Sequence, residues 1–188
     1  ARDVEEAMAL ATGMGFPHVN MDLIAGLPED TPEGFRRSLD ACLSFGTDNV
    51  TVHTLALKKG SAILNRGLRI PEPEAVGQML DYAGPALRAA GLAPYYLYRQ
   101  KYMSGSFENT GWCKPGFTGW YNIYMMEELH TILSLGGGGM NKINLPAEKL
   151  ARYHNPKIPQ DYISRIDTIL QQKDEIFSLL RQIREQNP

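Results

Sequence analysis

The sequence has few cysteines, no long apolar run and no excess of either charge. Its 188 residues include two cysteines, Cys42 and Cys113, which excludes a disulfide framework and favours a reducing, cytoplasmic compartment. No apolar run approaches the roughly 18 residues that a membrane span needs, and no signal-peptide pattern opens the chain. The 19 basic and 21 acidic residues give a net charge of −2, which provides no basic field for nucleic acid. We therefore expect neither nucleic acid nor a membrane as a partner.

An initiator methionine is also lacking. The chain opens on Ala1-Arg2-Asp3, already inside a helical pattern. Its length suffices for one good-sized domain or one and a half. We expect that the chain has been cut from a larger protein.

Helical and extended patterns alternate in the first half of the chain. Short links separate them, and this order is typical of parallel strands joined by crossover helices, an α/β architecture. Thr31-Pro32 resembles a helix N-cap followed by proline in the first turn. The helices are expected over residues 3–14, 31–46 and 71–91, and the strands over residues 19–26, 49–57 and 93–103.

The second half is less regular. Residues 104–122 are rich in glycine, serine and aromatic residues and predict a loop, and residues 125–135 have a short helical periodicity. The run Gly136–Gly139 predicts either a tight turn or a close backbone approach to a ligand. From Ile158 onward a long amphipathic helix is expected, which packs on its own domain or on a partner helix. Packing on its own domain is favoured, because Lys173 interrupts the apolar seam.

One acidic residue, Asp22, lies inside the apolar run from Val19 to Pro28. A run of this length that ends at Gly and Pro predicts a buried parallel strand. A carboxylate in such a strand is costly unless it is paired or used. Asp22 is therefore either a core acid that bonds to neighbouring groups or part of a ligand site.

Two of these segments resemble consecutive barrel strands of a known enzyme family. They read N-M-D-L-I-A-G-L-P-E-D-T over residues 20–31 and N-V-T-V-H-T-L-A-L-K-K-G-S over residues 49–61. The family is that of the oxygen-independent coproporphyrinogen III oxidases, which are radical S-adenosylmethionine (SAM) enzymes of haem biosynthesis. Further segments resemble the C-terminal part of its coproporphyrinogen dehydrogenase-like subgroup. They are Y-L-Y-R-Q-K at 96–101, E-N-T-G-W-C-K at 108–114, Y-N-I-Y-M-M-E-E at 121–128 and S-L-G-G-G-G-M-N-K at 134–142.

The resemblance implies a three-quarter barrel of parallel strands with a C-terminal cover region. Residues 1–91 would form the last barrel strands and helices, and residues 92–188 a mixed α+β region that ends in the long helix. Ligand sites in such barrels lie at the carboxyl ends of the strands. By motif, Asp22 falls where the family holds SAM with an acid, and Ala56 falls where backbone contacts the adenosine.

The resemblance also implies the chemistry of the full-length parent. SAM reduced by a [4Fe–4S] cluster yields a radical that abstracts hydrogen from the propionates of coproporphyrinogen III, and loss of carbon dioxide then gives protoporphyrinogen IX. Arg99, Lys101 and Lys142 are candidates for binding the propionates of this tetrapyrrole, since cations bind carboxylates by charge-assisted hydrogen bonds. Solvated surface residues are the alternative for each.

The chain departs from the family pattern in its cysteines. The cluster needs C-x-x-x-C-x-x-C, and this triplet is absent, as is the early glycine-rich SAM strand. We therefore expect no metal site in this chain, and an isolated fragment without turnover. Relatives that act as haem chaperones carry a His-Asn pair where this chain has Tyr121-Asn122, which lowers the rank of a chaperone function. A non-catalytic interaction domain, which self-associates through the C-terminal helix, is the third alternative.

Several other side chains have two interpretations. His53 is either a satisfied histidine of a buried strand or a proton donor. The tyrosines Tyr95, Tyr96 and Tyr98 either pack on the sheet or line a tetrapyrrole pocket. Cys113 has no neighbouring base in the sequence and is taken as structural.

Overall fold

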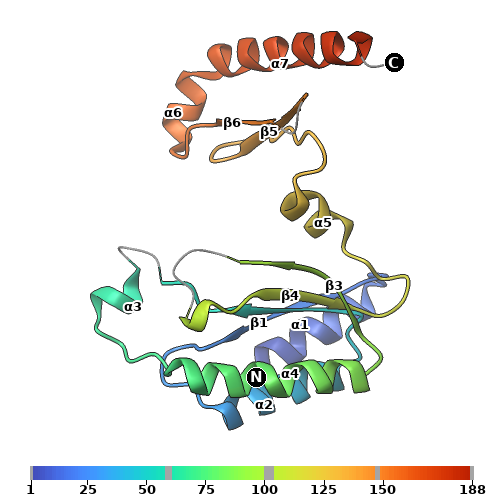
Figure 1. Cartoon of the computed structure of the whole chain (residues 1–188), viewed down its shortest axis with the longest axis vertical. Helices are drawn as coiled ribbons and strands as arrows, with labels where there is room; N and C mark the ends of the chain where they lie inside the picture. The colour runs from blue at the N-terminus through green and yellow to red at the C-terminus, as the bar shows by residue number, and fades with distance from the viewer. Residues whose placement is uncertain (1, 58–60, 100–103, 147–148, 187–188) are drawn as a thin grey trace. The chain divides into compact units, whose positions relative to one another are not determined.

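The computed structural model describes residues 2–57, 61–99, 104–146 and 149–186. The chain divides into two compact units, Ala1–Trp120 and Tyr121–Pro188, each of which is described by itself (Figure 1). The predicted division after residue 91 concerns the barrel and cover of a whole protein and stays a prediction. Among the described residues, no helix combines the length and apolar character that crossing a membrane requires.

The first unit is a four-stranded mixed sheet with helices packed on one face (Figure 1). The strand order is β1-β2-β4-β3; β1 and β2 are parallel, whereas β4 is antiparallel to both of its neighbours. The strands are β1 (Asn20–Ala25), β2 (Asn49–Thr54), β3 (Ala93–Tyr98) and β4 (Asn109–Cys113). The helices are α1 (Arg2–Gly13), α2 (Pro32–Ser44), α3 (Ala62–Asn65) and α4 (Pro73–Ala89), and η1 (Ser104–Ser106) is a short 3-10 turn.

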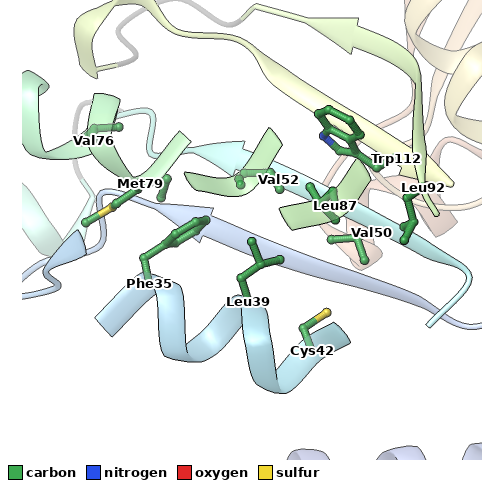
Figure 2. Packing of buried hydrophobic residues seen from close by; sticks show 12 residues of the cluster. Phe35, Leu39, Cys42, Val50, Val52, Val76, Met79, Leu87, Leu92 and Trp112 are labelled. Atoms are coloured by element: carbon green, nitrogen blue, oxygen red, sulfur yellow. The ribbon is translucent and has the colours of Figure 1, made fainter. Parts of the chain in front are cut away.

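Local sequence signals set the first crossover. The hydroxyl of Thr31 accepts a hydrogen bond from the Gly34 N–H at 3.0 Å, and Pro32 begins α2, which confirms the predicted cap. Phe35, Leu39 and Cys42 follow at helical spacing and are buried against the sheet (Figure 2). The short crossover through α2 makes β1 and β2 parallel, as predicted.

The core lies between the helices α2 and α4 and one face of the sheet. Apolar residues from α2, α4 and alternate positions of the strands meet there (Figure 2). The largest buried members include Phe35, Leu39, Val50, Val76, Met79 and Leu87. Trp112 of β4 completes the layer, and the guanidinium of Arg88 lies 5.0 Å from its ring centroid.

The predicted loop over residues 104–122 was wrong, because this segment contains β4. The strand lies between β2 and β3 and pairs with both. Its sequence, N-T-G-W-C, has no regular apolar alternation and contains residues that are rare in strands. Pairing on both sides, rather than local propensity, makes it a strand. The sheet is therefore mixed, and the expectation of parallel strands holds for β1 and β2.

The expectation that β1 is buried on both faces was also wrong. Met21 and Leu23 pack against the core, whereas Asn20, Asp22 and Ile24 on the other face are exposed. The strand thus alternates between a core face and an open face. Asp22 lies on the open face.

The second unit is a hairpin with three helices. Its elements are α5 (Trp120–Glu127), β5 (Met140–Leu145), β6 (Lys149–His154), α6 (Pro159–Ser164) and α7 (Ile166–Gln186). The predicted helix over 125–135 is displaced toward the N-terminus, and Glu128 at φ 52° follows α5. The long helix expected from Ile158 is divided at Arg165. Ile169 and Ile176 of α7 are buried.

The glycine run forms a tight turn. Gly136 and Gly138 have φ of 89° and 74°, in the left-handed region that favours glycine. A Cβ on Gly139 would lie 2.8 Å from that of Ser134. The Asn155 side chain closes the turn by donating to the Gly136 carbonyl at 2.8 Å. These contacts are internal to the unit and account for the glycines as turn residues.

Candidate functional site

The open face of the sheet, opposite the core, is polar. Alternate residues of β1 and β2 point there, because their neighbours in sequence pack on α2 and α4. Parallel pairing places Asp22 opposite Thr51, and Ile24 opposite His53. The polar residues that β1 and β2 bring to this face are Asn20, Asp22, Asn49, Thr51 and His53.

Tyrosines from β3 extend across β4 to reach these residues. Each tyrosine hydroxyl meets one residue of β2; the pairs are Tyr95 with Asn49 (3.3 Å), Tyr96 with Thr51, and Tyr98 with His53 (3.4 Å). Tyr96 and Tyr98 are stacked, with ring centroids 6.1 Å apart and an interplanar angle of 6°. Desolvation by burial is the main cause that raises the pKa of Tyr96.

Two backbone features allow this tyrosine layer. An irregularity of the β3–β4 register between Pro94 and Tyr96 lets the neighbouring Tyr95 and Tyr96 both contact the open face. Gly111 of β4 leaves room for the Tyr96 ring, because a Cβ there would lie 1.9 Å from the ring atom Cε1. The sequence contained the tyrosines and the glycine, but only the register brings them together.

Asp22 is held at the edge of this face and remains accessible. Its Oδ1 accepts a hydrogen bond from Asn20 Nδ2 at 2.7 Å, and its Oδ2 lies 3.7 Å from His53 Nε2. The side chain is 58% exposed. Asp22 is therefore not a core acid, and its carboxylate keeps free acceptor capacity for a ligand hydroxyl. The sequence had not indicated Asn20, although a spacing of two along a strand places both side chains on one face.

Ala56 follows the carboxyl end of β2 and is half-buried. The N–H of Leu55 donates to the Ala25 carbonyl at 2.9 Å, so the β1–β2 pairing continues beyond the strand ends. Ala56 thus lies near the carboxyl edge of the sheet, where parallel strands commonly present ligand sites. Its backbone role toward an adenosine stays a prediction.

A groove runs along the edge of β1. It has a volume of about 630 Å³ and is lined by side chains of α1, β1 and α2, among them Asp22, Arg37 and Cys42. In the part of the chain that the structure describes, β1 pairs only with β2, so its other edge is unpaired. Asp22 therefore borders both the polar face and this edge groove.

The predicted propionate-binding cations are already paired where the structure describes them. Arg99 Nη2 lies 3.0 Å from Glu108 Oε1. Lys142 is largely buried, and its Nζ lies 2.8 Å from Glu128 Oε1 and 2.7 Å from the Met125 carbonyl. A ligand carboxylate would have to compete with these internal partners. Lys101 lies outside the described residues.

Glu128 gives the second unit a predictable pH dependence. The hydrogen bond from Lys142 and, next, that from Arg152 hold the pKa of this carboxyl below its ordinary value of 4.5. A lowered folded-state pKa stabilises the fold above the unfolded value, and this contribution is lost as the pH falls through the folded-state pKa. We expect stability to decline below about pH 4.5 and the Glu128→Gln variant to decline less steeply.

Urea denaturation of the chain followed at a series of pH values measures this slope. The matched control is Glu175→Gln, a change on the exposed face of α7, which should retain the wild-type slope. Equal slopes for wild type and Glu128→Gln would contradict the assignment.

The cysteines occupy separate environments. Cys42 lies in the core, where burial raises its thiol pKa, and Cys113 of β4 is buried with its Sγ 3.8 Å from the hydroxyl of Thr118. Within residues 2–57, 61–99, 104–146 and 149–186, no group of three or more His, Cys, Asp or Glu side chains is arranged to hold a metal ion. The described donor set does not fit a [4Fe–4S] cluster, which needs clustered thiolates.

The fold and the site define the class: an α/β protein whose mixed sheet presents an open polar face along two parallel strands. Comparison with known proteins then identifies relatives. The chain matches no protein-family profile. It is 37% identical over 183 residues to the oxygen-independent coproporphyrinogen-III oxidase-like protein HemZ of Bacillus subtilis. This alignment covers 96% of this chain and 36% of HemZ. It is also 32% identical over 110 residues to the heme chaperone HemW of Mycobacterium tuberculosis, and this alignment covers 56% of this chain and 25% of HemW.

A solved structure shows the same fold. It is that of coproporphyrinogen III oxidase HemN from Escherichia coli, a radical SAM enzyme. The two structures superpose with a TM-score of 0.59 and 18% sequence identity, over 86% of this chain and 36% of the HemN chain. The chain is homologous to the radical SAM coproporphyrinogen oxidase family and corresponds to its C-terminal part. It spans about a third of the length of the HemZ and HemN relatives.

Proposed function

We propose that this chain is the C-terminal part of a radical SAM oxidoreductase that oxidatively decarboxylates the propionates of coproporphyrinogen III. The observation that carries the proposal is Asp22, an exposed carboxylate in the motif N-M-D-L-I-A-G-L-P. The homology supports the family, and the name of the HemZ relative supports the oxidase branch. The isolated chain is expected to be inactive, because its described residues offer no cluster site.

The described residues fit SAM better than they fit a cluster. When bound, SAM and a cluster held elsewhere supply hydrogen-abstracting radical chemistry to enzymes of this family. Asp22 would accept hydrogen bonds from the ribose hydroxyls, and the backbone at Ala56 would contact the adenine. Both groups belong to the first unit, so they can act together without any assumption about the second.

The partial barrel belongs to the same proposal. The parallel β1–β2 pair with its α2 crossover is the repeating unit of such barrels. The unpaired edge of β1 and the groove beside it would then receive the strand that precedes α1 in the full-length protein. Slower amide exchange of β1 in that longer protein than in this chain would support this; equal exchange would count against it.

The test of the proposal is the affinity for SAM of the full-length, cluster-containing protein. Asp22→Asn keeps the shape of the side chain but removes the charge that strengthens hydrogen bonds from the ribose. We expect a loss of affinity of about 10- to 100-fold, corresponding to about 1.4–2.7 kcal/mol. Isothermal titration calorimetry measures it.

The matched control is Asp40→Asn on α2, whose carboxylate accepts a hydrogen bond from the Tyr82 hydroxyl at 2.6 Å, away from the polar face. It should retain the wild-type affinity. Equal affinities for Asp22→Asn and wild type would refute the SAM assignment.

A haem chaperone is the second candidate, because HemW proteins are among the relatives. Titration with haem separates the two functions. Stoichiometric binding with a shifted Soret band would favour the chaperone, and its absence, together with conversion of coproporphyrinogen III by the full-length protein, would favour the oxidase.

Self-association through α7 is the third candidate. Leu170 and Phe177 on this helix are 53% and 47% exposed, although Ile169 and Ile176 pack within their own unit. Light scattering of the chain with and without residues 161–188 tests it. A monomer in both forms would contradict an interaction role for the helix.

A further inference from the structure

A row of polar side chains connects β3 to the Asp22 carboxylate. The Tyr98 hydroxyl lies 3.4 Å from His53 Nδ1, and the other ring nitrogen, Nε2, lies 3.7 Å from Asp22 Oδ2. His53 therefore bridges a tyrosine and a carboxylate through its two nitrogens. Its side chain is 26% exposed, so the imidazole is packed more tightly than the acid that it faces.

This arrangement selects one form of the neutral imidazole. A neutral histidine carries its proton on one nitrogen and accepts on the other. If the Tyr98 hydroxyl donates to Nδ1, the proton lies on Nε2, which faces the carboxylate. An N–H directed at Asp22 is electrostatically favourable, whereas a lone pair at the same position would repel it.

The distances also determine what remains free on Asp22. The 2.7 Å hydrogen bond from Asn20 holds Oδ1, while the 3.7 Å separation from His53 is too long for a hydrogen bond at Oδ2. The His53 ring thus leaves Oδ2 available as a hydrogen-bond acceptor. The Asp22 side chain is 58% exposed, so a ligand can reach this oxygen.

We propose that His53, anchored by Tyr98, is a positioning residue that orients the Asp22 carboxylate for a ribose diol. The proposal rests on the proposed SAM-binding role of Asp22 for its ligand, but the tautomer can be measured without any ligand. It gives Tyr98 a role apart from sheet packing, and it makes His53 neither an inert core residue nor a proton donor.

The first experiment is ¹⁵N NMR of the histidine rings in this chain, which reports which ring nitrogen carries the proton. The four histidines are distinguished by the loss of one ring system in His53→Gln. We expect His53 to be protonated on Nε2 in wild type, with a measurable shift toward the Nδ1-protonated form in Tyr98→Phe. The control Tyr82→Phe removes a tyrosine hydroxyl elsewhere in the unit and should leave the His53 signals unchanged.

The second experiment is SAM affinity in the full-length protein. His53→Gln and Tyr98→Phe should each weaken binding about 2- to 10-fold, which is less than Asp22→Asn, because they remove support and not the ligand contact. In the double variant His53→Gln/Tyr98→Phe the two losses should not add, since both residues act through one path.

The outcomes distinguish the two levels of the proposal. If wild type binds no SAM but His53 is protonated on Nε2 and responds to Tyr98→Phe, the function of the site is wrong and the positioning geometry stands. If Asp22→Asn loses affinity while His53→Gln and Tyr98→Phe bind as wild type, the positioning role is overturned. A His53 ring protonated on Nδ1 in wild type would also overturn it.

Discussion

Phe35→Ala is expected to destabilise the first unit by about 3–5 kcal/mol, the largest effect predicted for a single side chain here. Phe35 is 1% exposed and lies between α2 and the sheet, among Leu39 and Met79 (Figure 2). Removing its ring loses the free energy of burying that apolar surface. It also leaves a cavity that the close-packed helices and sheet can fill only in part. Urea denaturation followed by the fluorescence of the buried Trp112 measures the change.

The matched control is Phe16→Ala. This phenylalanine belongs to the same unit but is 60% exposed, and its replacement should change the stability by less than about 0.5 kcal/mol. A similar effect of both substitutions would mean that the core described between α2 and the sheet does not hold the unit together.

Gly111→Ala is expected to cost about 3 kcal/mol, at the upper end of overpacking penalties. The new Cβ would lie 1.9 Å from Tyr96 Cε1 and 3.0 Å from Tyr95 Cε1, so the Tyr96 ring has to move. Tyr96 is 8% exposed and bonded to Thr51, which leaves it little room for movement. Calorimetric unfolding of the chain would detect the loss as a lower melting temperature.

Gly13→Ala is the control for this substitution. A Cβ at Gly13 meets nothing within 4 Å, so the same added methyl group should be neutral or slightly stabilising. If Gly111→Ala also left the melting temperature unchanged, the Tyr96 ring would not lie over β4 as described. A double-mutant cycle isolates the clash: Gly111→Ala should lower the melting temperature less in a Tyr96→Ala background, where the ring is absent, than in the wild type.

The tyrosine layer gives the open face its shape. Each of Tyr95, Tyr96 and Tyr98 engages one polar residue of β2, and together they cover the sheet from the β3 side. Asp22 lies on the far strand, β1, and stays accessible. A ligand that contacts Asp22 would therefore approach from the β1 side of the sheet, near the groove and the unpaired edge of β1.

The sequence by itself determined the elements whose signals are local. Helix caps and apolar periodicity predicted these elements within a few residues. They are the Thr31-Pro32 cap, the apolar stripes of α2 and α4, and the strands β1, β2 and β3. The motif around Asp22 also indicated the family, which the comparisons confirm.

Only the tertiary structure decided what depends on pairing between distant segments. β4 is a strand because β2 and β3 form hydrogen-bonded pairs with it on both sides, and the sequence N-T-G-W-C by itself does not predict a strand. The open face of β1, the reach of Tyr98 to His53 and the approach of His53 to Asp22 follow from strand order and register. Local sequence cannot encode these contacts, because Tyr98 and His53 are 45 positions apart and His53 and Asp22 are 31 positions apart (53 − 22). At such separations the pairing is set by tertiary packing and not by local propensity.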